Sequence, residues 1–138
     1  MYYLIYISTS KRLLTEPELL DILTVSRRNN YVKNVTGMLL YAGGTFMQVL
    51  EGEEAVVKEV YQKVEQDTRH KNLIQLITGT TDHRNFPDWN MAFASVNSNI
   101  LVELESYMNP REKGFLDDSG SNTVFNMLKT FAESNHLN

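Results

Sequence analysis

The stretch Thr45-Phe-Met-Gln-Val-Leu-Glu-Gly52 decides the fold, because it has the pattern of an apolar strand and directly follows a Gly43-Gly44 turn. Side chains alternate along a strand, so Phe46, Gln48 and Leu50 are predicted to share one face. Gln48 is the exception on that face, since burying an amide without partners costs about 1–3 kcal/mol. The sequence therefore predicts that Gln48 bonds to neighbouring protein groups or faces a polar ligand.

Four more strands are predicted on either side of this stretch. Val35 to Tyr41 pairs with it in a hairpin across Ala42-Gly43-Gly44. The N-terminal run Tyr2 to Ile7 is rich in aromatic and β-branched residues, as expected for a central strand. Asn72 to Thr80 and Met91 to Val96 are predicted to be the fourth and fifth strands.

Two helices are predicted between these strands. Thr15-Glu-Pro-Glu18 has the pattern of a capping box with proline in the first turn. The inward stripe of this helix is predicted to be Leu19, Leu20, Ile22, Leu23 and Ser26. We expect the helix to end around Arg27-Arg-Asn-Asn30, and a second helix to run from about Glu53 to Gln66, where valines repeat at helical spacing.

This order of elements predicts an α+β, ferredoxin-like βαββαβ fold with an extra strand, in which two helices cover one face of a mostly antiparallel sheet. We expect a sensor domain over residues 1–96 and a helical extension over residues 97–138. Apolar stripes predict short helices at Asn99 to Met108 and Asn122 to Glu133. Helices this short need a partner surface, so the extension is predicted to cap the sheet or to form an interface through residues such as Tyr107 and Phe115, not to be a separate output domain.

The composition excludes several classes of function. A net charge of −4 over 138 residues argues against nucleic-acid binding, which needs cationic surface. The chain has no cysteine, which excludes disulfides, zinc ribbons, iron–sulfur clusters and thiol nucleophiles. Its 3 histidines have no ligand-like spacing, so no metal site is expected. No apolar run approaches the ~20 residues of a membrane span, and a cytoplasmic location is expected.

The polar residues that stand out on this framework are predicted to meet beneath the two helices. If the first and third strands are neighbours, the hydroxyl of Tyr6 can reach the amide of Gln48. Asn29 and Asn30 can direct amides into the same space, which has aliphatic walls such as Ile22 and Val64. A slot of this kind suits a flat heteroaromatic ring with ring carbonyls and nitrogens. Taken singly, these residues also have structural explanations, since asparagine often caps helices and tyrosine often packs in cores.

Six short motifs occur in one order along the chain: Leu4-Ile-Tyr6, Arg28-Asn-Asn30, Val35-Thr-Gly37, Phe46-Met-Gln-Val-Leu-Glu-Gly52, Asp67-Thr-Arg-His70 and Asn85-Phe-Pro-Asp-Trp-Asn-Met91. Over about residues 1–96 this ordered set resembles the BLUF family, the bacterial and algal blue-light sensors that bind FAD. The resemblance implies that FAD is the cofactor and that the protein is a photoreceptor rather than an enzyme.

The resemblance also implies roles for individual residues. Tyr6 matches the photoactive tyrosine that donates an electron to excited flavin, and Gln48 matches the glutamine between that tyrosine and the ring. Trp89 and Met91 match a pair whose position responds to light. Lys63 departs from relatives that carry arginine, so bidentate contact is not expected there. The full set of implied cofactor contacts is Tyr6, Ile22, Ser26, Asn29, Asn30, Gln48, Lys63, Val64, Asp67, Arg69 and His70.

The function implied by the resemblance is a reversible, red-shifted signalling state that is read out through the fifth strand and the C-terminal helices. The expected partner is an unidentified downstream protein, and a homo-oligomer is expected. Because the red shift needs no covalent adduct, the lack of cysteine agrees with this function. Two alternatives stay open: a flavin-free ferredoxin-like interaction module, and a small ferredoxin-like enzyme, which would need a phosphate cradle or an acid–base pair that the sequence does not display.

Overall fold

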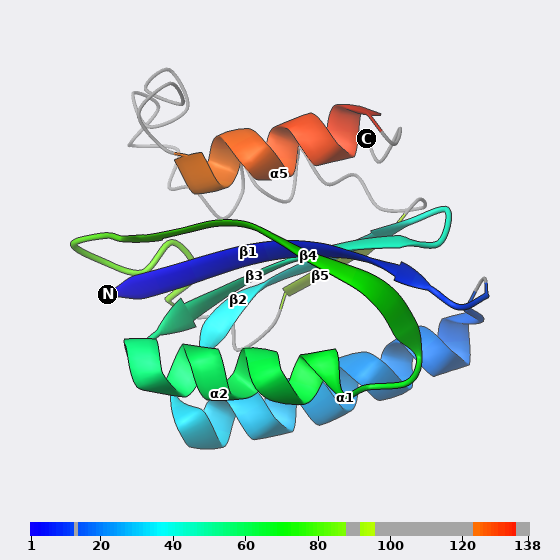
Figure 1. The fold of residues 1–138 in the computed structure, drawn as a ribbon, viewed down its shortest axis with the longest axis horizontal. Coiled ribbons are helices and arrows are strands. Elements are labelled where there is room, and N and C mark those ends of the chain that lie inside the picture. The colour runs from blue at the N-terminus through cyan, green and yellow to red at the C-terminus, as the bar shows by residue number, and fades with distance from the viewer. Residues whose placement is uncertain (13, 88–91, 96–122, 135–138) are drawn as a thin grey trace.

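The computed structural model describes residues 1–12, 14–87, 92–95 and 123–134. Its elements follow the order β1 (Tyr2–Ser10), α1 (Glu16–Lys33), β2 (Thr36–Ala42), β3 (Thr45–Gly52), α2 (Glu54–Glu65), β4 (His70–Thr80), β5 (Ala92–Ser95) and α5 (Thr123–Ser134). Helices α1 and α2 lie on one face of the sheet, and α5 lies on the opposite face (Figure 1). The predicted ferredoxin-like α+β fold is confirmed. None of the helices described is long and apolar enough to cross a bilayer.

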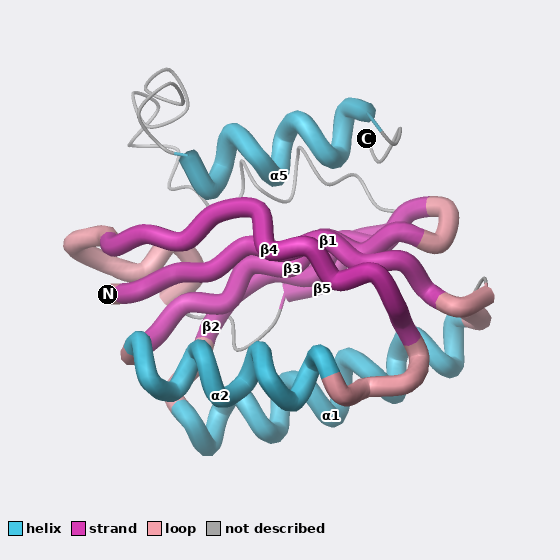
Figure 2. Tube along the Cα trace, in the orientation of Figure 1, coloured by secondary structure: helices cyan, strands magenta, loops and turns pink. Residues whose placement is uncertain are grey.

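The sheet has the strand order β4-β1-β3-β2-β5 (Figure 2). Neighbouring strands are antiparallel except β5, which runs parallel to β2. β1 and β3 are therefore neighbours, as the predicted meeting of Tyr6 and Gln48 requires, and these two residues are direct partners in the register. The site residues of both strands thus lie near the centre of the sheet, where a neighbouring strand on each side holds the backbone.

The β2–β3 hairpin fixes which face each β3 side chain occupies. Gly43 and Gly44 have φ of 54° and 89°, a backbone conformation that glycine adopts without steric cost. With the register set by this turn, Phe46 and Gln48 point toward α1 and α2, while Met47 points toward α5. A slip of one residue would move Gln48 to the α5 side, so the Gly-Gly turn determines the orientation of the candidate site residue.

Helix α1 begins as predicted but ends later. The capping box of Thr15 and Glu18 is present. The predicted end at Arg27-Arg-Asn-Asn30 is wrong, because the helix continues to Lys33 and closes at Asn34, which has φ of 56° and bonds through its N–H to the carbonyls of Asn30 and Tyr31. Asn30 therefore lies inside the helix. Leu20 was expected in the inward stripe, but it is 53% exposed.

Two apolar layers enclose the sheet. The layer beneath α1 and α2 contains the buried side chains of Leu4, Tyr6, Leu19, Leu23, Val35, Leu39, Tyr41, Phe46, Leu50, Val57 and Val60. In the other layer, Val124, Leu128 and Phe131 of α5 pack against the opposite face of the sheet. The sequence left two outcomes open for this helix, docking on the sheet or forming an interface. The structure shows α5 docked on the sheet. The other expected helix, Asn99 to Met108, and the residues Tyr107 and Phe115 lie outside the described residues.

Truncation of Leu128 is expected to detach α5 from the sheet. The Leu128 side chain is fully buried, and Leu→Ala at such positions typically costs about 2–5 kcal/mol. We expect Leu128→Ala to lower the free energy of unfolding, or to speed amide exchange throughout α5 if the helix undocks alone. Thr130→Ala, at an exposed position of the same helix, is the matched control. Equal urea midpoints and equal α5 exchange for the two variants would contradict the docked position.

Candidate functional site

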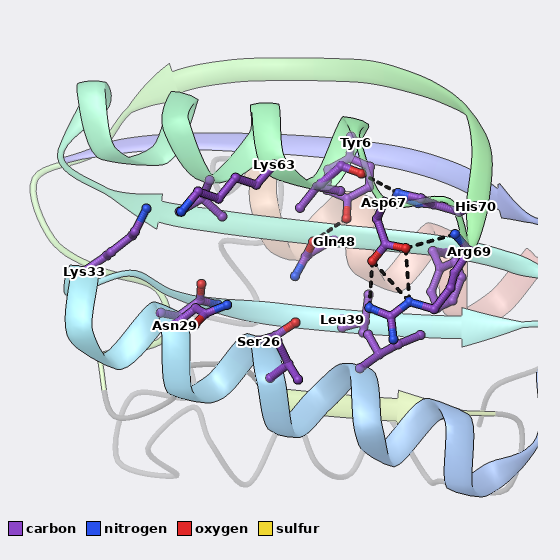
Figure 3. A pocket seen from close by; sticks show the side chains of 16 residues that line it. Tyr6, Ser26, Asn29, Lys33, Leu39, Gln48, Lys63, Asp67, Arg69 and His70 are labelled. Carbon is purple, nitrogen blue, oxygen red and sulfur yellow. Dashed lines mark hydrogen bonds and ion pairs between the residues drawn. The ribbon is translucent and has the colours of Figure 1, made fainter.

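A pocket with a volume of about 170 Å³ lies between α1, α2 and the sheet (Figure 3). All the cofactor contacts expected from the sequence line it: Tyr6, Ile22, Ser26, Asn29, Asn30, Gln48, Lys63, Val64, Asp67, Arg69 and His70. The lining residues that the sequence analysis missed are Val25, Lys33, Leu39, Phe46 and Val60. Most of these could have been found by periodicity, since they lie one helical turn, or two strand positions, from an expected residue.

Tyr6 and Gln48 form the innermost polar pair of the pocket. The Tyr6 hydroxyl donates a hydrogen bond to Oε1 of Gln48, as their opposite positions on β1 and β3 allow. Both side chains are buried, with Gln48 5% exposed. The amide nitrogen of Gln48 points away from Tyr6 (Figure 3). The arrangement therefore leaves the N–H end of Gln48 directed into the pocket, where it can donate to a ring nitrogen or carbonyl.

Burial keeps the Tyr6 phenol protonated. Loss of hydration is the largest cause that raises the pKa of Tyr6, and the neighbouring Tyr61 and Asp67 raise it further. The phenol is therefore a neutral hydrogen-bond donor at any pH below its ordinary value of about 10. A proton can leave this group only when a second change, such as the loss of an electron, makes the phenol acidic.

Helix α1 supplies one wall through residues spaced along a single face. Successive lining residues of α1 are about one helical turn apart, so their side chains stack along the pocket. Ile22 is followed by Ser26, and Ser26 is followed by Asn29 and Asn30. Asn30 is 2% exposed, whereas Asn29 is exposed. Because α1 continues to Lys33, both asparagines lie on regular helix and have fixed side-chain directions. The wall thus combines an aliphatic surface with amides at one end.

The chain after α2 closes the opposite end of the pocket with a set of interlocked polar groups. Arg69 donates to Asp67, with Nη2 to Oδ2 at 2.7 Å and Nε to Oδ1 at 3.0 Å. This pairing lowers the pKa of Asp67, so its carboxylate stays ionised. The ring of His70 donates from Nε2 to the Val64 carbonyl at 2.6 Å and bonds through Nδ1 to Ser8 Oγ at 2.9 Å. These contacts hold the end of the pocket in a defined shape before any ligand binds.

Two lysines meet where α1 and α2 approach each other. Lys33 forms an ion pair with Glu59 across the two helices, with Nζ to Oε1 at 2.5 Å. Glu59 raises the pKa of Lys33, and the adjacent Lys33 lowers the pKa of Lys63. Both ammonium groups line the pocket. This part of the pocket therefore combines two cations with one carboxylate, which suits an electron-rich edge or an anionic group of a ligand.

The residues present fit a planar ring with polar edges. A cavity of ~150 Å³ lined by aliphatic side chains already binds benzene, and this pocket, at about 170 Å³, is also open to solvent for the rest of a larger molecule. Buried amides of Asn30 and Gln48 supply both donors and acceptors to such a ring. Among the described residues, no group of three His, Cys, Asp or Glu side chains could hold a metal ion.

The fold and the pocket define a ferredoxin-like domain whose pocket between two helices fits a planar heteroaromatic cofactor. The sequence model of the BLUF family, described as sensors of blue light using FAD, matches residues 1–92. The chain therefore belongs to the BLUF family, and its cofactor is FAD. The family description makes the BLUF domain a photosensor.

Individual relatives agree with this membership. The chain is 36% identical over 81 residues (59% of its length) to photoactivated adenylate cyclase subunit alpha of Euglena gracilis, and 38% identical over 66 residues (48% of its length) to the blue light- and temperature-regulated antirepressor BluF of Escherichia coli (strain K12). These matches cover only 8% and 16% of the two relatives. The structure of BlsA in its photo-activated state matches with a TM-score of 0.67 and 34% identity over 76% of each chain.

The photoactive pair expected near the fifth strand is not placed by the structure. Trp89 and Met91 lie outside the described residues, and their role stays a prediction. The residues just before them, Asn85, Phe86 and Pro87, are described, and the first two are buried.

Proposed function

We propose that this protein is a blue-light photoreceptor in which Tyr6 and Gln48 form the photoactive pair beside bound FAD. The observation that carries the proposal is the buried hydrogen bond from the Tyr6 hydroxyl to Oε1 of Gln48 inside the pocket. The bond gives the phenolic proton a path that needs no water and no other side chain. It also fixes the direction of the Gln48 amide in the dark, so a reversal of that amide changes the contacts of the pocket.

The chemistry follows from these two residues. FAD supplies the absorption of blue light and, when excited, an electron-poor ring. Tyr6 would give an electron to that ring, which would make its phenol acidic, and the proton would move along the existing hydrogen bond to Oε1 of Gln48. When the electron and the proton return to Tyr6, Gln48 would not resume its earlier orientation or tautomer. Its N–H could then donate to a ring carbonyl, which would stabilise the excited state more than the ground state and shift the absorption to longer wavelength.

The remaining lining residues are proposed to bind and orient the cofactor. Ile22 on α1 and Val64 on α2 both line the pocket and would pack on the two faces of the ring. Asn30 is buried, like Gln48, and its amide would bond to a ring carbonyl. The other polar contacts proposed for the ring edge and the ribityl chain are Ser26, Asn29, Lys63, Asp67, Arg69 and His70.

The signal is proposed to pass to a separate protein. The relatives include a cyclase subunit and an antirepressor, so BLUF domains act on effector proteins. We propose that residues 1–96 are the sensor and that residues 97–138 form a cap or interface that takes part in the readout. A cytoplasmic homo-oligomer that binds a downstream protein is the form proposed for this chain.

An absorption spectrum of the purified protein, in darkness and after blue light, tests the proposed function. We expect a flavin spectrum that shifts to longer wavelength by several nanometres or more and recovers in the dark. Chromatography of the released flavin should identify FAD. A colourless protein that cannot be loaded with FAD would favour the flavin-free interaction module. A protein that binds FAD but shows only irreversible bleaching would contradict the proposed photochemistry.

A further inference from the structure

Glu51 is a fully buried carboxylate that lies outside the flavin pocket. It is 0% exposed and accepts hydrogen bonds at both oxygens. Oε1 accepts from the hydroxyl of Thr36 at 2.9 Å and from the backbone N–H of Phe86 at 2.6 Å. Oε2 accepts from the backbone N–H of Asn85 at 2.9 Å and from its side-chain amide at 3.4 Å. The carboxylate therefore holds two consecutive backbone N–H groups of the chain that follows β4.

A buried anion is tolerated only where donors replace its hydration. Arg84 completes the arrangement without touching the carboxylate. Its Nη1 donates to Thr36 Oγ1 at 2.9 Å and to the Glu51 backbone carbonyl at 3.1 Å, and its Nη2 donates to the Asn34 carbonyl at 2.7 Å. The hydroxyl of Thr36 thus accepts from Arg84 and donates to Glu51. The start of the β4–β5 connection is bound to both strands of the β2–β3 hairpin.

The place of Glu51 in the fold links this contact to the photoactive pair. Glu51 is three positions after Gln48 on β3, and alternation turns it toward the opposite face of the sheet, the α5 face. Phe86, whose N–H it holds, is fully buried in the layer that also contains Val124 and Leu128 of α5. The chain that leaves Phe86 then reaches β5, which pairs with β2. One short stretch is therefore bonded to β3, shares an apolar layer with α5 and leads, through five further residues, to β5.

We propose that Glu51 is a positioning residue for the readout of light: its carboxylate fixes the backbone of Asn85 and Phe86, and the Phe86 ring couples the β4–β5 connection to α5. The proposal rests on the proposed function, because it concerns how a light-induced rearrangement at Gln48 is transmitted from the sheet to the β4–β5 connection and α5. A rearrangement that reaches the β4–β5 connection from the sheet must either break the Glu51 contacts or move Phe86 together with α5.

The contact geometry makes Glu51→Gln a sharp test. Glutamine has the same shape, but one of its two terminal groups is an NH₂ donor. Whichever way the amide is placed, this NH₂ faces a backbone N–H, of Phe86 or of Asn85, and that donor loses its acceptor. An unsatisfied buried donor costs about 1–3 kcal/mol, so we expect the amide of Asn85 or of Phe86 to exchange about fivefold faster or more in the dark.

The experiment uses the full chain with FAD bound and compares amide exchange in darkness and under blue light. In the wild type we expect light to change exchange at Phe86 and along Thr123–Ser134. In Glu51→Gln we expect an unchanged red shift, since the flavin pocket lies on the other face of the sheet, but loss of the light-dependent difference in α5. Glu53→Gln is the matched control: the same substitution at the exposed N-cap of α2, where the side chain makes no capping bond.

Thr36→Val is a milder second variant, should Glu51→Gln fail to fold. It keeps the carboxylate and the volume but removes the hydroxyl between Arg84 and Glu51, and a smaller change in the same direction is expected. The proposal is overturned if the wild type shows no light-dependent exchange in α5, if folded Glu51→Gln retains it, or if Glu53→Gln loses it equally. Absence of any red shift in the wild type would defeat the proposed function instead, and the dark exchange of Asn85 and Phe86 would still test the Glu51 contacts.

Discussion

Replacing Gln48 by leucine is expected to abolish the light-induced red shift while FAD remains bound. Leucine fills a similar volume between Phe46 and Leu50, and the rest of the pocket wall is unchanged. It has no donor to offer a ring carbonyl, so the lit hydrogen bond cannot form. The same substitution leaves the buried Tyr6 hydroxyl without its acceptor, at a cost of about 1–3 kcal/mol. Difference spectra before and after illumination, together with flavin titration, measure both effects.

The control for this variant is Gln62→Leu, the same substitution at an exposed position of α2. It should keep the full red shift. Gln48→Ala and Gln48→Glu should also lack the shift, because neither side chain can reverse an amide. A normal red shift in Gln48→Leu would show that the spectral change arises elsewhere in the pocket, and the proposed role of Gln48 would have to be abandoned.

Local sequence signals predicted those parts of the fold that depend on a few adjacent residues. The Gly43-Gly44 turn fixes the register of the hairpin, and the register fixes the face of Gln48. The Thr15 and Glu18 capping box fixes the start of α1. In each case the deciding residues lie within four positions of the feature that they determine, so single-sequence reasoning had the information that it needed.

The end of α1 and the contacts of Glu51 could not be predicted in the same way. Asn29, Asn30 and Asn34 are the same residue type, and the choice of Asn34 as the left-handed cap depends on tertiary packing that buries Asn30. Glu51 was expected only as a residue of the strand stretch Thr45 to Gly52. Its partners are 15 to 35 positions away in the sequence, and an acidic residue next to a glycine usually lies at the surface.

The candidate site was found from the sequence because its motifs occur in an ordered set, not because any one residue identifies it. Phe46 and Leu39 were missed as lining residues, although alternation along β3 places Phe46 on the face of Gln48 and the hairpin register pairs Leu39 with Gln48. Lys33 was missed because the helix was expected to end before it. The ion pair between Lys33 and Glu59 requires that α1 continues to Lys33 and that this end lies beside α2. That arrangement depends on how the two helices pack on the sheet.

Tyr6→Phe is expected to remove the red shift completely and to raise the fluorescence of bound flavin, because the proposed electron donor is lost. Phenylalanine retains the ring in the core but has neither the hydroxyl proton nor the low oxidation potential of a phenol. Tyr61 provides the matched control, since its ring centroid lies 5.4 Å from that of Tyr6. Tyr61→Phe should keep the red shift. Photoactivity in Tyr6→Phe that disappears in the double variant would assign electron donation to Tyr61 instead.

The pH dependence of the wild type gives a second measurement on the same residue. Burial raises the pKa of Tyr6, so the phenol is still protonated where an ordinary tyrosine, with a pKa of about 10, would be half ionised. The amplitude of the red shift should therefore stay constant as the pH rises from 7 to about 10. Because the folded state holds this proton more tightly than the unfolded chain, the stabilisation is fully present below about pH 10 and is lost as the pH rises further. An amplitude that titrates well below pH 10 would mean that the proton moved by light does not belong to a buried phenol.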